Sequence, residues 1–140
     1  YIDAQPKSIQ LCRIDAVPDN FLFVTGKDGS EEIKLTDWEY AGMQDPHLDV
    51  AMFIIYAMYD RDSAEKLIDL YFSDGCDKAI RLKIYCYIAV SGLVWSNWCE
   101  FKRHCGVEFG AYAQRQYDYA REYTKIFFKE YREAFGRDYV

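Results

Sequence analysis

The sequence predicts an α+β protein that is mainly helical, with a small β-hairpin followed by about four helices. Two short apolar runs before residue 40 flank a glycine-containing turn, which is the pattern of a hairpin. From residue 48 onward the apolar residues recur at helical spacing. The chain has 140 residues, of which 51% are hydrophobic, so it is long and apolar enough for one domain with a real core.

The β part occupies the first third of the chain. We expect a short strand over Ser8–Cys12. The hairpin strands are expected at Phe21–Thr25 and Ile33–Thr36, because the residues GKDGS lie between them and supply a turn. Pro18 fixes one backbone angle in the loop before the hairpin. The segment Tyr40–His47 contains a glycine and a proline and is predicted to be a loop.

Four helices are predicted after this loop. The first is apolar almost all round, so we expect it to be buried at the centre of the fold. The second has apolar and charged residues on opposite sides, the third is long and apolar, and the last is amphipathic and rich in tyrosine. Their expected bounds, in chain order, are Asp49–Tyr59, Ser63–Phe72, Asp77–Arg103 and Tyr112–Phe135.

Composition argues against several classes of function. The net charge of −6 disfavours a non-specific nucleic-acid binder, which would present a basic surface. No apolar run is judged long enough to span a membrane, so no membrane partner is expected. The five cysteines are odd in number and lack C-x-x-C spacing. They therefore predict reduced thiols in a cytoplasmic protein and support neither a disulfide framework nor a zinc site.

Two carboxylates and an amide between residues 12 and 40 suggest phosphoryl-transfer chemistry. Asp15 and Asn20 are five positions apart, and Asp37 follows the second hairpin strand. This chemistry needs a carboxylate near the attacking hydroxyl and oxygen ligands for magnesium. In protein kinases a D-x-x-x-x-N loop and a later Asp supply both. A loop Asp or Asn is also a common turn residue, so the spacing alone leaves both interpretations open.

A longer pattern resembles a known family. The segments RIDAVPDNFLF, KLTDWEYAGMQDPHLDVA, VWSNWCEF and VEFGAYAQRQYDYA resemble the choline and ethanolamine kinases, especially bacterial choline kinases, within the aminoglycoside-phosphotransferase-like superfamily. The resemblance implies that residues 1–140 form a single domain, the C-terminal substrate- and metal-binding lobe of a protein-kinase-like fold. Residues 1–10 hold no counterpart of a glycine-rich loop or ATP-contacting lysine, so we expect the N-terminal ATP-binding lobe to be absent from this chain.

The resemblance also assigns roles around the loop. Asp15 would be the catalytic base that orients and partly deprotonates the acceptor hydroxyl. Asn20 and Asp37 would be ligands of Mg²⁺, which accompanies ATP, and this chain would hold only part of the ATP site. Asp49 would anchor the catalytic loop by hydrogen bonds. Alternatively, its charge offsets the dipole at a helix N-terminus.

An aromatic acceptor site is a further implication of the resemblance. The W-S-x-W and F-G-x-Y segments resemble the choline-binding part of the family. Aromatic faces attract a quaternary ammonium by about 1–2 kcal/mol per desolvated ring, and Trp95 and Trp98, three positions apart, share a helix face. Aromatic residues at helical spacing are also common in cores, and the chain has 13 tyrosines. The residues expected to bind substrate are Tyr40, Trp95, Trp98, Tyr112 and Tyr117.

Two positions depart from the family. Arg13 stands where the family has a histidine that packs against the catalytic loop and hydrogen-bonds to it. Its permanent charge could pair with the carboxylate of Asp15 or Asp37, or point at phosphate, and we assign it a structural role beside the site. Tyr56 stands where many choline kinases carry an acidic residue near the ammonium. Both changes weaken the expectation of full activity.

The sequence therefore predicts a choline kinase-like phosphotransferase that acts on choline or a related amino alcohol. This chain would supply the base, the Mg²⁺ ligands and the acceptor pocket, and we expect it to be inactive alone. Two alternatives stay open. One is an aminoglycoside or sugar kinase lobe, whose cleft would be lined by carboxylates, and the other is a degenerate lobe that serves as a binding or scaffold module. The surface left by the missing lobe is expected to favour association with other chains.

Overall fold

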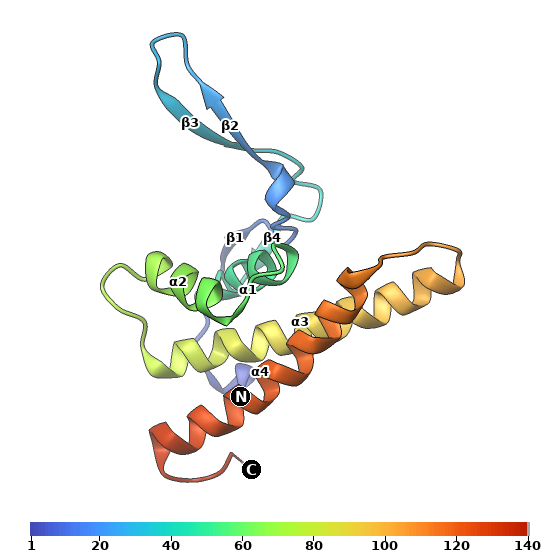
Figure 1. Ribbon diagram of the computed structural model, residues 1–140. Helices are drawn as coiled ribbons and strands as arrows, with labels where there is room; N and C mark the ends of the chain where they lie inside the picture. The colour runs from blue at the N-terminus through green and yellow to red at the C-terminus, as the bar shows by residue number, and fades with distance from the viewer. Residues whose placement is uncertain (140) are drawn as a thin grey trace.

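The computed structural model describes residues 1–139, and in them a helical body carries a projecting β-hairpin (Figure 1). The helices are α1 (His47–Tyr56), α2 (Arg61–Tyr71), α3 (Lys78–His104) and α4 (Ala111–Phe135). The strands are β1 (Gln10–Cys12), β2 (Phe21–Thr25), β3 (Glu31–Leu35) and β4 (Gly42–Gln44), with 3₁₀ turns at Ile2–Ala4 and Pro18–Asn20. The predicted class, a mainly helical α+β fold with a hairpin and four helices, is confirmed.

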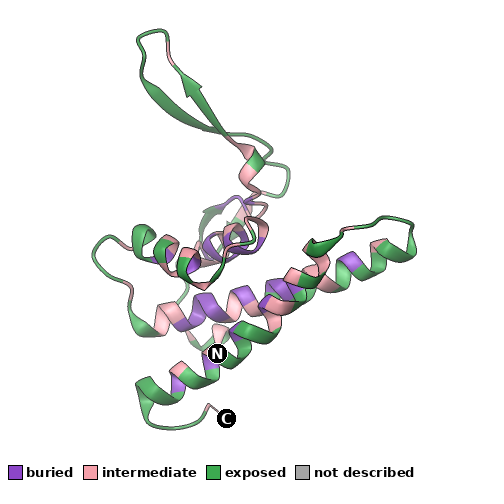
Figure 2. Ribbon diagram, viewed as in Figure 1, coloured by how far each residue is buried: buried purple, intermediate pink, exposed green. Residues whose placement is uncertain are grey.

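Helix α1 lies at the centre of the fold, as predicted (Figure 2). Five of its ten residues are buried, and it packs against α2 and α3. The helix ends at Tyr56, three residues before the predicted end, because Met58 adopts a left-handed conformation with φ 52°. The Tyr59 amide then donates to the Ile54 carbonyl at 3.1 Å, which closes the helix with a Schellman motif.

Helices α3 and α4 form a long antiparallel pair beneath α1 (Figure 1). The two helices approach closely at Gly92 of α3, where a Cβ atom would lie 2.7 Å from the Gln116 carbonyl oxygen and 2.9 Å from the Tyr119 Cβ. A residue without a side chain is needed at this crossing. From α4, the Gln116 amide nitrogen donates to the Ile55 carbonyl at 2.9 Å, so α1 is tied to the pair.

Strands β1 and β4 pair antiparallel, with Cys12 opposite Gly42. Strand β4 lies inside the segment predicted to be a loop, so that prediction was wrong for residues 42–44. The strand has three residues and its partner lies far earlier in the chain, and therefore no local alternation marks it. The pairing returns the chain from the hairpin to the start of the loop that carries Asp15.

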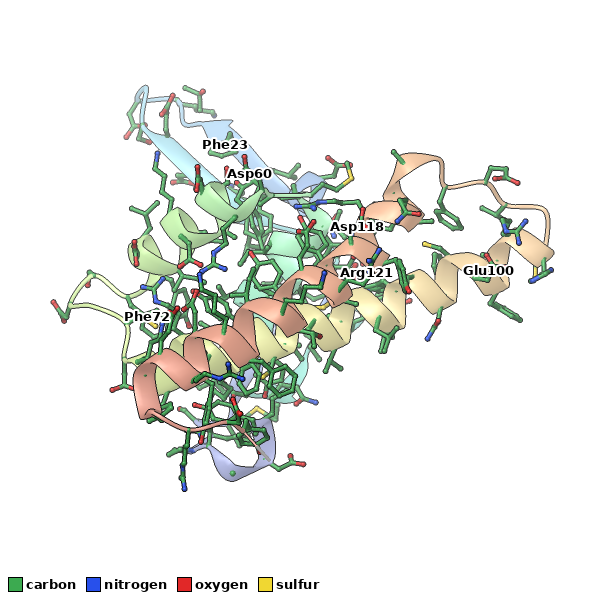
Figure 3. The ribbon with its side chains drawn as sticks, turned by 60° about the horizontal axis from the view of Figure 1, so that its bottom comes forward. Phe23, Asp60, Phe72, Glu100, Asp118 and Arg121 are labelled. Atoms are coloured by element: carbon green, nitrogen blue, oxygen red, sulfur yellow. The ribbon has the colours of Figure 1, made fainter. Side chains whose placement is uncertain are left out.

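The β2–β3 hairpin occupies the predicted place, although β3 begins two residues earlier than expected. Phe21 pairs with Leu35 at its base. Most hairpin side chains are exposed (Figure 2), and Phe23, labelled in Figure 3, is 81% exposed. The Thr36 amide continues the ladder to the Asn20 carbonyl at 3.1 Å, so the chain segment that leads into Asp37 is bonded to Asn20 at the base of the hairpin.

Helix α3, with 27 residues, is the one helix among residues 1–139 that is long and apolar enough to cross a membrane. The expectation that no segment reaches this length was therefore wrong. Its buried face carries Lys83, which is ion-paired with Asp45 at 2.7 Å, and α4 and α1 pack along it.

Candidate active site

The loop that carries Asp15 has a constrained backbone. Ile14 has φ 66°, a left-handed conformation that β-branched residues rarely adopt and that costs about 1–3 kcal/mol. The two carboxylate oxygens of Asp49 accept the amides of Arg13 at 2.9 Å and of Ile14 at 2.8 Å. Asp49 therefore holds the residues immediately before Asp15, and strain of this kind concentrates at functional sites.

Arg13 joins the Asp15 loop to the segment that carries Asp37. Its side chain is buried, and its Nε donates to the Asp15 carbonyl at 3.0 Å. Its Nη2 donates to the carbonyls of Thr36 and, at 3.0 Å, Asp37. In the described part of the chain Arg13 forms no ion pair with a carboxylate, so its charge is directed at backbone oxygens. Two aromatic rings flank the guanidinium, those of Phe21 and Trp38.

Asn20 and Asp37 both come from the base of the hairpin, where the amide of Thr36, the residue before Asp37, donates to the Asn20 carbonyl at 3.1 Å. Asp37 is exposed and has φ 61°, a conformation that Asp tolerates better than most residues. Residues 1–139 contain no cluster of three His, Cys, Asp or Glu side chains suited to a metal. Mg²⁺ needs no such cluster, because one or two protein oxygens usually bind it together with substrate phosphates and water. The oxygens of Asn20 and Asp37 fit that donor set.

A cavity of about 760 Å³ opens beside Asp15. Its walls come from the Asp15 loop, the segment after Asp37, α1, α3 and the start of α4. Six of the ten lining residues are aromatic, and among these ten described residues Asp15 is the only charged one. The lining consists of Ile14, Asp15, Val17, Tyr40, Met52, Tyr56, Trp95, Trp98, Phe109 and Tyr112.

The rings form a continuous wall from α1 to α4. Tyr56 lies 5.6 Å from Trp95, measured between ring centroids, and Trp95 lies 5.1 Å from Trp98 in an edge-to-face pair. The wall continues from Trp98 to Phe109 at 5.2 Å and on to Tyr112 at 6.4 Å. These separations are those of favourable aromatic contacts, so each ring fixes the orientation of the next.

The Asp15 carboxylate helps to raise the pKa of each tyrosine that lines this cavity. Burial, followed by a hydrogen bond and charge from Asp15, raises the pKa of Tyr56. Burial is also the main cause that raises the pKa of Tyr112, with a contribution from Asp15. The Glu39 carboxylate, and more weakly Asp15, raises the pKa of Tyr40. The three phenols therefore stay protonated at neutral pH and can donate hydrogen bonds.

Known proteins similar to this chain were found by sequence and by structure, although no protein-family model matches the chain. Protein LicA of Haemophilus influenzae is 27% identical over 119 residues, which is 78% of this chain and 41% of that protein. A choline/ethanolamine kinase family protein from Mesorhizobium loti has a TM-score of 0.72 and 26% identity, over 89% of this chain and 42% of its own. Choline kinase LicA from Streptococcus pneumoniae has a TM-score of 0.63 and 28% identity, over 86% and 41%. The chain resembles the choline/ethanolamine kinase family.

The predicted resemblance is thereby confirmed, and the fold is that of a kinase-like C-terminal lobe. The chain spans about two fifths of the length of these choline/ethanolamine kinase relatives. One of the similar structures is LicA in complex with AMP, which shows a nucleotide bound to that relative.

Four of the five residues expected to bind substrate by likeness to choline kinases line the aromatic cavity, and Tyr117 does not. Tyr117 lines a second cavity of about 350 Å³, which shares Phe109 with the first. Tyr112 and Tyr117 are five positions apart, which is about 140° around a helix. They therefore lie on different faces of α4, and Tyr117 does not line the cavity in which it was expected.

Sequence reasoning missed several residues of the cavity wall. Phe109 precedes Tyr112 by three positions in the F-G-x-Y segment, and this spacing could have indicated it. Tyr56 was noted as a departure from the choline kinases, but its place in the wall beside Asp15 was not predicted. Ile14, Val17 and Met52 carry no sequence signal for a cavity.

Proposed function

We propose that this chain carries the acceptor and metal-binding side of a kinase that transfers a phosphoryl group from ATP to the hydroxyl of choline or a related amino alcohol. The observation that carries the proposal is the cavity in which a single carboxylate, Asp15, meets six aromatic rings. The relatives add support, because the LicA protein of Streptococcus pneumoniae is a choline kinase.

The ring wall accounts for recognition of the head group. A quaternary ammonium has no N–H to donate, and the faces of Trp, Tyr and Phe attract it by cation–π interaction. A primary ammonium gains most from carboxylate acceptors, and within the described chain Asp15 is the one carboxylate of the wall. The cavity therefore favours a trimethylated ammonium over ethanolamine.

Asp15 acts as the base in this proposal. Its carboxylate accepts a hydrogen bond from the acceptor hydroxyl, orients the oxygen and takes the proton as the phosphoryl group is transferred. The protonated phenol of Tyr56 can donate to the same carboxylate. Arg13 donates to the Asp15 carbonyl, and Asp49 accepts the amides of the two residues before Asp15. Asn20 and Asp37 would hold Mg²⁺, which neutralises charge on the phosphates when it is bound.

Calorimetric titration of choline into the chain, with and without Mg·ADP, tests the proposal. We expect saturable binding in the micromolar to millimolar range. Trp95→Ala removes one ring, worth about 1–2 kcal/mol, and should weaken binding about tenfold. Ethanolamine should bind more weakly than choline.

Val90→Ala is the matched control, because Val90 lies exposed on the same helix and does not line the cavity. Its affinity for choline should equal that of the unmodified chain. A folded chain that binds no choline under either condition would contradict the proposal and favour a scaffold module.

A further inference from the structure

We infer that Lys83 is a positioning residue that sets the place of the Asp15 loop relative to the aromatic wall. Lys83 lies on α3 and does not line the cavity. The functional consequence rests on the proposed function, whereas the positioning itself rests on the contacts of Lys83 and can be tested without a ligand.

Lys83 and Asp45 form a fully buried ion pair. Lys83 is 1% exposed and Asp45 is 2% exposed, and Lys83 Nζ lies 2.7 Å from Asp45 Oδ2. Nζ also donates to the Pro6 carbonyl at 2.9 Å. The Tyr87 hydroxyl donates to Asp45 Oδ2 at 3.2 Å, and the His47 amide donates to Oδ1 at 3.1 Å. Both charges are therefore paired and hydrogen-bonded, as burial requires.

Asp45 connects this pair to the start of α1. Beyond the side-chain contact with His47, its carbonyl accepts the Leu48 amide at 2.9 Å, so Asp45 holds the first turn of the helix. Asp49 lies in that same turn and accepts the amides of Arg13 and Ile14. The contacts thus run from α3 through the first turn of α1 to the residue before Asp15.

A second connection supports the first. Gln44 immediately precedes Asp45, and its carbonyl accepts the Cys12 thiol at 3.4 Å. Gly42 pairs with Cys12 in the β1–β4 ladder. Residues 12, 13 and 14 are therefore all bound to the segment between residues 42 and 49, and Lys83 fixes that segment on α3.

The same helix carries two rings of the aromatic wall, Trp95 and Trp98. Trp95 follows Lys83 by twelve positions, or about 18 Å along an ideal helix. The contact between Lys83 and Asp45 thus sets the position of Asp15 relative to the indole rings of α3. A buried ion pair often adds little net stability compared with apolar packing, but it can specify one arrangement. An effect on the position of the loop can therefore be measured separately from an effect on the stability of the whole fold.

Hydrogen exchange measured by NMR on the whole chain tests the inference. Lys83→Met alone would leave the Asp45 charge unpaired and would destabilise the fold. The double variant Lys83→Met/Asp45→Asn removes that charge and keeps an acceptor for the His47 amide. In it we expect the protection of the Arg13 and Ile14 amides to fall about tenfold, the effect of loosening one or two hydrogen bonds. Core amides of α4, such as that of Tyr123, should change less than about twofold.

Arg81→Met is the matched control. Arg81 lies two positions before Lys83 and forms ion pairs with Glu65 and Asp69 of α2, so its loss should leave the amides of residues 13 and 14 unchanged. Unchanged loop protection in the double variant would overturn the inference. Equal loss in loop and core would also overturn it, because Lys83 would then only stabilise the whole fold.

The unmodified chain offers an independent check if the double variant does not fold. One opening of the Asp45 region should expose the Ile14 and Leu48 amides together, so their protection factors should agree within about threefold. Protection factors of these two amides that differ by much more than this would contradict the inference. Choline titration runs in parallel: absence of binding by the unmodified chain would defeat the proposed function and leave the exchange test intact.

Discussion

Ile14 and Asp37 both hold left-handed backbone conformations, with φ 66° and 61°. Each lies at or next to a carboxylate with a proposed chemical role. The Asp49 carboxylate holds the first conformation, and the Arg13 guanidinium holds the carbonyl of the second. Because these contacts fix the backbone, the Asp15 and Asp37 carboxylates are placed before any ligand binds.

The proposed metal role of Asp37 predicts a loss of binding without a loss of stability. Asn tolerates the left-handed conformation as Asp does, and the position is exposed, so Asp37→Asn should change the free energy of unfolding by less than about 0.5 kcal/mol. Binding of Mn²⁺, used as a spectroscopic substitute for Mg²⁺, should weaken at least several-fold. Asp74→Asn, in the exposed turn before α3, is the control. Equal Mn²⁺ binding by both variants would refute the metal role.

The buried guanidinium of Arg13 predicts a large cost on removal. Arg13→Met leaves the carbonyls of Asp15, Thr36 and Asp37 without this donor, and charged hydrogen bonds contribute about 1.5–3 kcal/mol each. We expect the free energy of unfolding in urea to fall by about 2–4 kcal/mol. Arg13→His introduces the residue that the choline kinases are expected to have here, and it has fewer donors than Arg. The free energy of unfolding of this variant should lie between those of Arg13→Met and the unmodified chain. A fall of less than about 1 kcal/mol for Arg13→Met would show that the loop is held by other contacts.

At the scale of elements, helical periodicity predicted each helix to within a few residues. Strand β4 was not predicted, because a three-residue strand that pairs with a distant strand leaves no local pattern in the sequence. The early end of α1 was not predicted either, because a methionine such as Met58 does not normally indicate a left-handed residue at the end of a helix. Local patterns therefore located the elements, and long-range contacts determined their ends.

The α3–α4 crossing predicts that Gly92→Ala is destabilising. In an isolated helix the change would favour folding by up to about 1 kcal/mol. Here the added Cβ would meet the backbone of Gln116 at 2.7 Å, so the helices must separate and we expect a net loss of about 1–3 kcal/mol. The thermal midpoint of unfolding measures this, with the exposed Val90→Ala as control. An unchanged or higher midpoint for Gly92→Ala would show that the helices can shift freely.

For the whole molecule, three buried or half-buried groups, His47, Asp45 and Glu130, predict destabilisation by acid. Burial, with help from the Lys83 charge, lowers the pKa of His47 from 6.5, so the unfolded chain takes up that proton first. Burial alone would raise the pKa of Asp45 and Glu130, but hydrogen bonds and charges outweigh it and lower both pKa values. They come from Lys83 and His47 at Asp45, and from Lys78 and Arg61 at Glu130. Groups of this kind stabilise the fold above their unfolded pKa, and the stabilisation is lost as pH falls. Stability should decline below about pH 6.5 and more steeply near pH 4.5.

Glu130 offers a specific test of this decline. It lies 2.6 Å from Arg61 and 2.5 Å from Lys78, and it joins α4 to α2 and α3. Glu130→Gln should lower the thermal midpoint at pH 7 and reduce its fall between pH 5 and pH 3. Glu133→Gln, an exposed neighbour, should leave the pH profile unchanged. A profile unaffected by Glu130→Gln would exclude Glu130 as a source of the acid sensitivity.

The candidate site could be predicted only in part because it is assembled across the whole molecule. The resemblance to choline kinases implied Asp15, Trp95 and Trp98. The inclusion of Tyr56 and Phe109, and the exclusion of Tyr117, depend on how α1, α3 and α4 cross. That crossing is set by contacts such as Gly92 against α4, which lie outside the cavity and have no signature near the site residues.

The most direct test of the proposed acceptor site is an isotope-filtered NOE spectrum of the ¹³C-labelled chain saturated with unlabelled choline. The cavity predicts NOEs from the choline methyl protons to the rings of Tyr56, Trp95 and Tyr112. Trp95→Phe should retain the contacts to the other two rings. Methyl NOEs that are absent under saturation, or that fall on the exposed hairpin ring of Phe23, would contradict the site.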